Sequence, residues 1–336
     1  MKKLVIALAI LAGAIAAPDA RAEIGTADAV PAATLLLPYF EVDLGDQNGV
    51  TTLISVNNAS ASAAAANVVL WTDWGVPSFG FNVYLTGYDV QTINLRDIFN
   101  GTLPVTADDG ADPSDSFLPN TGISNQGDLS QDINFPGFNG PCGGASTLYD
   151  APDPTLAIKI QNIQQVHRGL GSPLDGQCWG ANHGDSIARG YVTIDSVTQC
   201  TLDTPAGPTY FVGGVADSRN ILWGDAIVVN PAQNFAQGDT LVHVEACVPG
   251  NGFRGYVGDG AGRCPLVPGD YSFYGRYAGV LFSGADQREP LATTFAARYQ
   301  GASKTDLLVW RDTKLPPSGV NGPRTCGSAP AWFPHA

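Results

Sequence analysis

Short apolar runs dominate the sequence, and clusters of Gly, Pro, Asn, Asp and Ser separate them. In the run TTLISVNN, residues 51–58, Ile54 and Val56 would share one face of a strand, because side chains of a strand point alternately to its two sides. One apolar face and one polar face are typical of antiparallel sheets. About ten such runs and one good helix predict a mainly β fold, an antiparallel β-sandwich with long loop insertions and one main α-helix.

The segments expected to form strands share this alternation or a short apolar run bounded by turn residues. They are residues 33–43, 50–58, 67–75, 81–87, 89–95, 190–200, 220–230, 240–248, 271–282, 293–300 and 306–312.

Two details of these segments carry further expectations. Pro38 lies inside the first run and indicates an edge strand or a bend, because proline has no N–H to donate to a neighbouring strand. The Ala-rich run ASASAAAA, residues 59–66, predicts a connection made of small residues.

The helix is expected at residues 154–170. Asp153 would cap it, and Ile160, Ile163 and Val166 follow helical spacing. Gly169 or Gly171 would end it. A shorter turn of helix is expected in LRDIF, residues 95–99.

Residues 100–153 form a long acidic loop insertion with many turn formers and little periodicity. Its carboxylates make calcium possible, although their spacing does not match an EF-hand loop. The alternative is a solvated acidic loop without a metal. The candidate calcium ligands are Asp108, Asp109, Asp112 and Asp115.

Residues 1–22 have the parts of a secretory signal peptide. Two lysines precede an apolar run that is short for a membrane span, and Ala20-Arg21-Ala22 supplies small residues at the cleavage site. We expect cleavage after Ala22, which leaves residues 23–336 as a single elaborated β-sandwich domain. A retained anchor is the alternative. The expected location is secreted, periplasmic or on the cell surface, with no membrane insertion after signal removal.

The six cysteines all follow the signal, and in an exported chain an even number favours disulfides over a metal site. The sequence alone does not fix the pairing, but Cys247 and Cys264 bracket a Gly-rich stretch and make the best single pair. The disulfide candidates are Cys142, Cys178, Cys200, Cys247, Cys264 and Cys326.

The charge of the chain bears on its partners. The signal removes 3 of 17 basic and 1 of 31 acidic residues, so 14 Lys and Arg remain against 30 Asp and Glu, a net charge of −16. Such a charge argues against nucleic acid, whose binding depends on neutralising phosphates. It also argues against anionic membrane surfaces. Glycans or other envelope proteins remain as possible partners.

Motifs for catalysis are scarce. There is no nucleophile elbow, phosphate loop or dinucleotide fingerprint. His183, Asp185 and Ser186 lie together in NHGDS, but neighbours on a loop seldom form a triad, so a polar turn is the favoured interpretation. His243 and Glu245 alternate with two valines, which predicts a solvent-facing ion pair or one side of a zinc site. These observations favour a non-catalytic protein without deciding the question, and they single out no catalytic residue.

A Trp-x-Asp stretch recurs three times, at Trp71, Trp223 and Trp310. Each is expected to end an aliphatic strand and to lead into a turn, where the indole covers the end of the core. A ligand platform is the alternative. If these three rings are buried, a binding site is expected instead at Asp73, Trp74 and Trp179 and in the long acidic loop.

The runs LLLPYFEVDLGDQNGVTTLISVNNAS, LTGYDVQTINLRDIF, GYVTIDSVTQC, LVHVEA and TDLLVWRD together resemble an uncharacterised family of exported bacterial β-sandwich-like proteins. The likeness extends from about Ala33 to Lys314. It implies export and a β-rich fold, and it carries no catalytic residues to this chain.

Two functions follow from these features. The first is an exported, non-catalytic envelope or extracellular protein with a structural, adhesive or assembly role. The alternative is a secreted carbohydrate-binding or carbohydrate-processing protein, because six tryptophans, eleven tyrosines and surplus carboxylates suit sugar faces and their hydroxyls.

Overall fold

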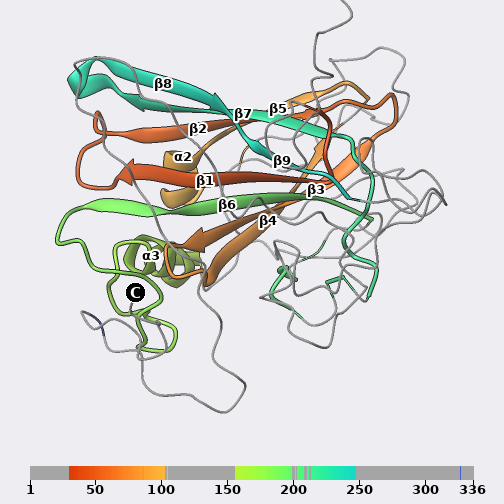
Figure 1. Cartoon of the computed structure of the whole chain (residues 1–336). Coiled ribbons are helices and arrows are strands. Elements are labelled where there is room, and N and C mark those ends of the chain that lie inside the picture. Colours follow the sequence, from red (N-terminus) through yellow and green to blue (C-terminus); the bar gives the residue numbers. More distant parts are fainter. Residues whose placement is uncertain are drawn as a thin grey trace, which may run out of the picture.

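The fold consists of two antiparallel sheets that face each other, with few helices, as the sequence predicts (Figure 1). The structure is a computed structural model. It describes residues 30–85, 87–102, 104, 156–198, 201, 203–207, 210, 211, 213–246 and 326. The predicted signal peptide, most of the acidic loop and the strands expected at residues 271–282, 293–300 and 306–312 lie outside these ranges.

The larger sheet has five strands in the order β4-β3-β6-β1-β9, so β6 lies at its centre. All its neighbouring pairs run antiparallel. Its strands are β1 (Thr34–Asp43), β3 (Ala64–Thr72), β4 (Pro77–Leu85), β6 (Ile187–Val197) and β9 (Val242–Val244).

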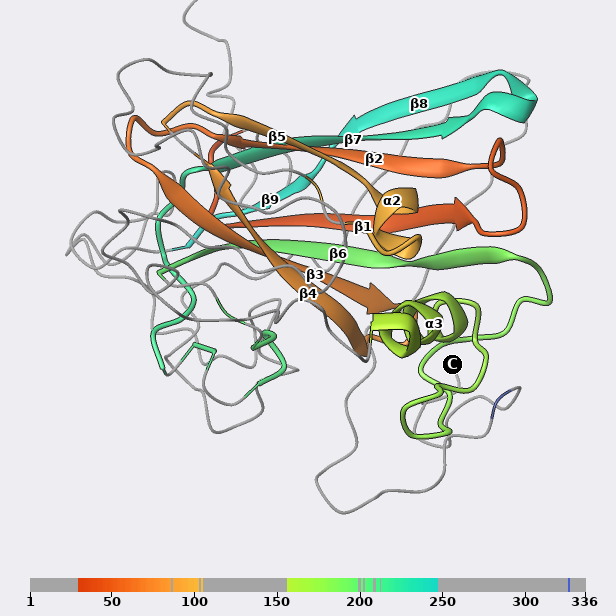
Figure 2. The same cartoon turned by 180° about the vertical axis from the view of Figure 1, so that it is seen from behind.

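The smaller sheet has four strands in the order β5-β2-β7-β8, and β7 and β8 form a hairpin along its open edge (Figure 2). After β8 the chain crosses to the larger sheet, where β9 pairs with β1. The strands are β2 (Thr51–Asn58), β5 (Val90–Asn94), β7 (Leu222–Asn230) and β8 (Phe235–Thr240).

The main core lies between the sheets. Ile54 and Val56 contribute to it from β2, and Val83, Leu85 and Ile93 from β4 and β5, as their alternation predicts. Burial of this apolar surface is the largest favourable term available to such a fold.

A second cluster covers the outer face of the larger sheet. Trp71 of β3 stacks on Tyr191 of β6, with ring centroids 5.6 Å apart, and Tyr210 and Phe211 belong to the same cluster. The strands β3 and β6 are therefore buried on both faces, which explains why their sequences depart from simple alternation.

Two expectations about these strands need correction. Ala64, Ala65 and Ala66 are not a connection but the buried start of β3, because small side chains fit between the two layers that cover this strand. β1 is not an edge strand, since it pairs with β6 and β9. Pro38 instead lies in an irregularity between Leu37 and Phe40, where the register shifts, so its bend is the correct alternative.

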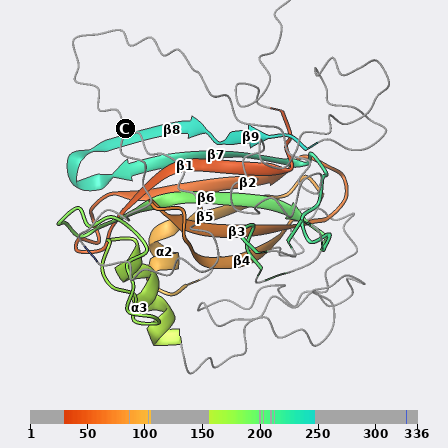
Figure 3. The same cartoon turned by 60° about the horizontal axis from the view of Figure 1, so that its bottom comes forward.

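Three short helical segments accompany the sheets: α2 (Leu95–Phe99), α3 (Leu156–Val166) and the 3-10 turn η1 (Pro231–Gln233). α3 lies beside the first residues of β4 (Figure 3). Its predicted stripe is present, with Ile163 and Val166 buried and Ile160 packed against the main core. Gly169 follows in the left-handed conformation, φ +66°, as a helix stop requires.

Arg96 of α2 holds the turn between β1 and β2. Its Nη1 donates to the carbonyl oxygens of Asp43 (2.6 Å) and Asp46 (3.0 Å). Its Nη2 donates to those of Gly49 (3.0 Å) and Val50 (2.8 Å). The guanidinium fork thus acts as an internal cation among four inward-turned carbonyls.

Replacing Arg96 with Ala should destabilise the fold by about 2–4 kcal/mol, because four carbonyls lose a charged donor. Arg96→Lys should recover only part of this loss, since one ammonium cannot reproduce the fork. Urea unfolding measures both. Arg219→Ala, which removes an exposed ion pair with Asp217, is the matched control and should cost less than about 1 kcal/mol. Equal losses in the two alanine variants would contradict the account.

Candidate functional site

Two loops meet at one end of the larger sheet, and we call them the loop cluster: residues 72–76, after β3, and residues 171–186, before β6. The Thr72 hydroxyl donates to the carbonyl of Trp179. One oxygen of Asp73 accepts the backbone N–H of Ala181 at 2.9 Å. The structure therefore brings Asp73 and Trp179, which the sequence singles out, into one region.

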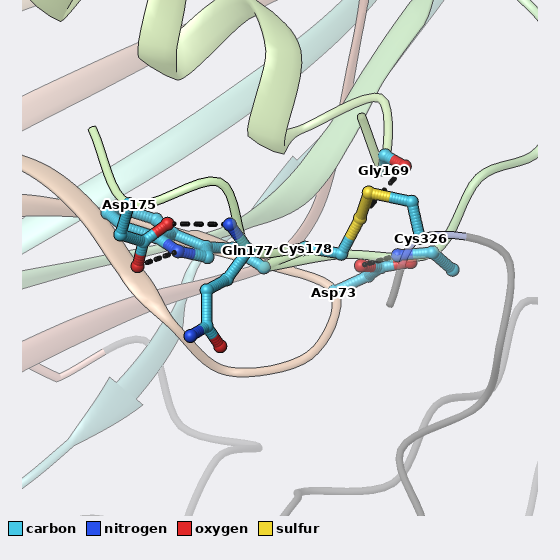
Figure 4. The surroundings of a disulfide bond; sticks show 8 residues. Asp73, Gly169, Asp175, Gln177, Cys178 and Cys326 are labelled. Carbon is cyan, nitrogen blue, oxygen red and sulfur yellow. Dashed lines mark hydrogen bonds between the residues drawn. A yellow bond between two sulfur atoms is a disulfide. The ribbon is translucent and has the colours of Figure 1, made fainter. Parts of the chain in front are cut away.

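A disulfide joins this region to a distant part of the chain. Cys178 is bonded to Cys326, across a sequence separation of 148 residues, and its sulfur lies 3.7 Å from the carbonyl oxygen of Gly169 (Figure 4). The bond agrees with the expectation of disulfides. The other candidates, including the preferred pair Cys247 and Cys264, lie outside the described residues.

Asp73 is the polar centre of the loop cluster. Its second oxygen lies 3.2 Å from Nε2 of His183, and the side chains of Asp73 and His183 are 14% and 45% exposed. Burial raises the pKa of Asp73, although the Ala181 N–H and His183 act in the opposite direction. Both oxygens are thus engaged in holding residues 181–183 against the sheet.

Arg189, near the start of β6, forms a second polar group beside it. The guanidinium donates to both carboxylate oxygens of Asp185, at 2.8 and 2.7 Å, and lies 3.6 Å from Glu41 on the neighbouring strand. The Tyr39 hydroxyl also donates to Glu41. The bond from Arg189 lowers the pKa of Asp185, and burial together with Glu41 raises the pKa of Tyr39. One guanidinium thus serves two carboxylates in this group.

The two predicted aromatic residues are placed differently. Trp179 is half-buried, and its indole N–H donates to Asp175 at 3.1 Å, so its ring is fixed at the surface. Trp74 is half-buried in the turn that begins with Asp73. No ring contact joins these two indoles in the part of the chain that the structure covers, so they do not form one stacked platform.

His167 fastens α3 to β6, a role that the sequence did not reveal. Its carbonyl accepts the Arg189 N–H at 3.0 Å, and its Nδ1 lies 2.9 Å from the Arg189 carbonyl. A carbonyl only accepts, so Nδ1 carries the proton and Nε2 accepts from the Ser78 hydroxyl at 2.6 Å. The neutral ring packs between Phe40 and Phe99. Only its position just after a helical apolar stripe could have hinted at this.

The Ser78–His167 pair has the bond of a serine nucleophile and its base, but its surroundings give it a structural role. His167 is buried, and burial lowers its pKa to about 4. An activated serine needs its hydroxyl beside a substrate and an oxyanion site. Here the bond instead ties β4 to the end of α3.

The NHGDS segment is the polar turn that was expected. His183 lies beside Asp73, Asp185 binds Arg189, and the Ser186 hydroxyl donates to Asp43 at 2.7 Å. The three side chains have three separate partners, so they do not assemble a triad.

The three Trp-x-Asp stretches prove to differ. Trp71 is fully buried at the end of β3, as predicted. Trp223 contradicts the prediction, because it is half-buried at the start of β7, and Asp225 pairs within the sheet opposite Ser55 instead of leading into a turn. Trp310 lies outside the described residues.

His243 also differs from its prediction. It is 2% exposed and accordingly forms no solvent-facing ion pair. Its Nδ1 lies 2.6 Å from the Val30 carbonyl, and its ring contacts the edge of Trp223 at a centroid distance of 5.9 Å. The crossing from β8 to β9 turns the side chain inward between the sheets, which reverses the face that simple alternation assigned.

Within the described ranges, no group of three or more His, Cys, Asp or Glu side chains is arranged to hold a metal ion. The candidate calcium ligands of the acidic loop fall outside those ranges, so calcium stays a prediction. Of the helices described, none has the length and apolar character to cross a membrane.

No protein-family model, curated protein or solved structure matches the chain. The resemblance to an exported bacterial family consequently stays a prediction, and the function has to be argued from the site itself.

The buried neutral state of His167 predicts a specific pH dependence. Its pKa is about 4 in the folded protein against 6.5 ordinarily, so folding opposes its protonation. Stability should be fully present above pH 6.5 and should fall towards pH 4, by up to about 3 kcal/mol from this group. Urea unfolding between pH 7 and 4 measures the loss.

His167→Gln removes the titration and should flatten that part of the profile, at the cost of lower stability at pH 7. An unaltered slope in His167→Gln would show that other groups cause the pH dependence.

Proposed function

We propose that this chain is an exported, non-catalytic envelope or extracellular protein with an adhesive role, and that the loop cluster is its contact surface. Loops held on a rigid sheet suit recognition, because little entropy is lost when a fixed surface binds.

The proposal rests on the bonds that Asp73 makes within the loop cluster. Both its oxygens hold the backbone or the imidazole of residues 181–183, and Arg189 is likewise engaged with Asp185 and Glu41. Groups that could perform acid–base chemistry serve as supports. These supports hold Trp179, His183 and Asp185 at the surface, an aromatic residue among polar ones. A tryptophan in such a setting is typical of the residues that dominate binding energy at contact surfaces.

Glycan binding is the second candidate. It is favoured by one observation, the half-buried Trp179 ring fixed by Asp175, because a sugar face can stack on an indole while carboxylates bind its hydroxyls. Trp74, in the turn after β3, would add a second aromatic side chain to such a surface. Carbohydrate processing has less support, since the nearby carboxylates are engaged as described.

Export can be tested separately. Cell fractionation should recover the protein outside the cytoplasm, and N-terminal sequencing should read Glu23 as the first residue. Recovery of a full-length chain in the cytoplasm would contradict the proposal at its first step.

Adhesion can be tested with the purified mature protein, bound to whole cells that lack the gene and to a glycan array in parallel. Trp179→Ala should weaken cell binding about tenfold or more, because a surface tryptophan is a common hot spot. Trp223→Ala, at a half-buried tryptophan of the other sheet, is the matched control and should bind normally.

Glycan-array binding that is lost in Trp179→Ala would favour the second candidate. Binding to neither cells nor glycans would contradict the adhesive proposal, as would equal binding by the two tryptophan variants.

A further inference from the structure

The open edge of the smaller sheet is unusual in its exposure. All six residues of β8 are exposed, and so is the η1 turn that precedes it, from Pro231 to Gln233. The other edges are better protected: five of the nine residues of β4 are buried, and β9 has only three residues. On β5, at the far side of the same sheet, exposed and buried residues alternate over the first four positions.

The side chains of β8 do little to prevent strand pairing. Natural edge strands are commonly protected by lysines, prolines or bulges. β8 has the sequence FAQGDT, with one charge and no proline, and its register with β7 runs without a shift from Asp225–Thr240 to Asn230–Phe235. Such an edge presents a regular row of backbone donors and acceptors.

The direction of these backbone groups follows from one hydrogen bond. The N–H of Leu241 donates to the carbonyl of Gly224 at 3.0 Å, in register with the β7–β8 pairs. Bonding alternates along an antiparallel pair, so Gln237 and Asp239 also bond towards β7. The N–H and C=O groups of Ala236, Gly238 and Thr240 therefore point to the open side.

We propose that β8 pairs antiparallel with β8 of a second copy of this chain, so that the two smaller sheets join into one. A two-fold axis normal to the sheet keeps each face on its own side, so paired residues must be both even or both odd in number. The outward groups are those of even residues. Gly238 opposite Gly238 of the second copy satisfies both conditions.

Charge supports this register. It places Gln237 opposite Asp239 of the second copy, twice, where an amide can donate to a carboxylate. Ala236 lies opposite Thr240, and the two Asp239 carboxylates do not face each other. A Cβ built at Gly238 would lie 3.4 Å from Ile227 Cγ1, an ordinary contact, so side chains are tolerated at this position.

The pairing is independent of the adhesive role proposed above, because it uses the other sheet and none of the loop cluster. It should strengthen with salt up to physiological ionic strength, since each mature copy carries a net charge of −16 and salt screens that repulsion.

The test uses the mature chain. Light scattering coupled to gel filtration should show a concentration-dependent dimer. Gly238→Lys should be monomeric, because it sets two ammonium groups opposite each other. Val90→Lys, at an exposed position on the β5 edge, should still dimerise. A wild-type protein that is monomeric at every concentration, or a Gly238→Lys variant that dimerises normally, overturns the proposal.

A cysteine variant tests the register. Gly238→Cys should form a disulfide-linked dimer on mild oxidation, because residues directly opposite in a bonded pair have Cα atoms about 5.5 Å apart, within the range of a disulfide. Ala236→Cys faces Thr240 and should not cross-link. Peptide mapping identifies the 238–238 link, and cross-linking that is equal in the two variants or absent from both contradicts this arrangement.

Discussion

The burial of β6 on both faces is the constraint on which the rest of the structure depends. Val192 and Ile194 face the main core, while Tyr191 and Thr193 lie under the second cluster, where the Trp71 indole donates to the Thr193 hydroxyl at 2.8 Å. A strand held from both sides cannot slip by one residue without moving the side chains of the main core into the second cluster, and those of the second cluster into the main core. The start of β6 is consequently fixed in space, and so is the end of the loop, residues 171–186, that leads into it.

The loop cluster uses this rigidity. Asp73 at the end of β3 and Arg189 near the start of β6 hold the same loop from two sides, and His167 ties α3 to the backbone of Arg189. Each of these ionisable or polar groups is engaged in supporting the loop cluster, on which the half-buried Trp179 ring lies. In the two proposals made above, the larger sheet would hold the contact surface, and the smaller sheet would offer an edge for assembly.

Much of the fold could be predicted from sequence, because alternation specifies the faces of β2, β4 and β5, and helical spacing specifies α3. The predictions failed where a strand is covered on both sides, as with the alanines that begin β3, or where the chain changes sheets, as with His243. Asp73 and Trp179 could be singled out by residue type alone. Their proximity, the His167 clamp and the contact between Arg189 and Glu41 join residues more than twenty positions apart, which no local pattern encodes.

The central claim is that Asp73 fixes residues 181–183 rigidly to the sheet, so that the loop cluster is a preformed surface. Native-state hydrogen exchange at the Ala181 amide tests it most directly. The account predicts strong protection of this amide in the wild type and its loss in Asp73→Ala, while amides of β6 keep their protection. An Ala181 amide that exchanges as fast in the wild type as an unstructured loop would contradict the claim.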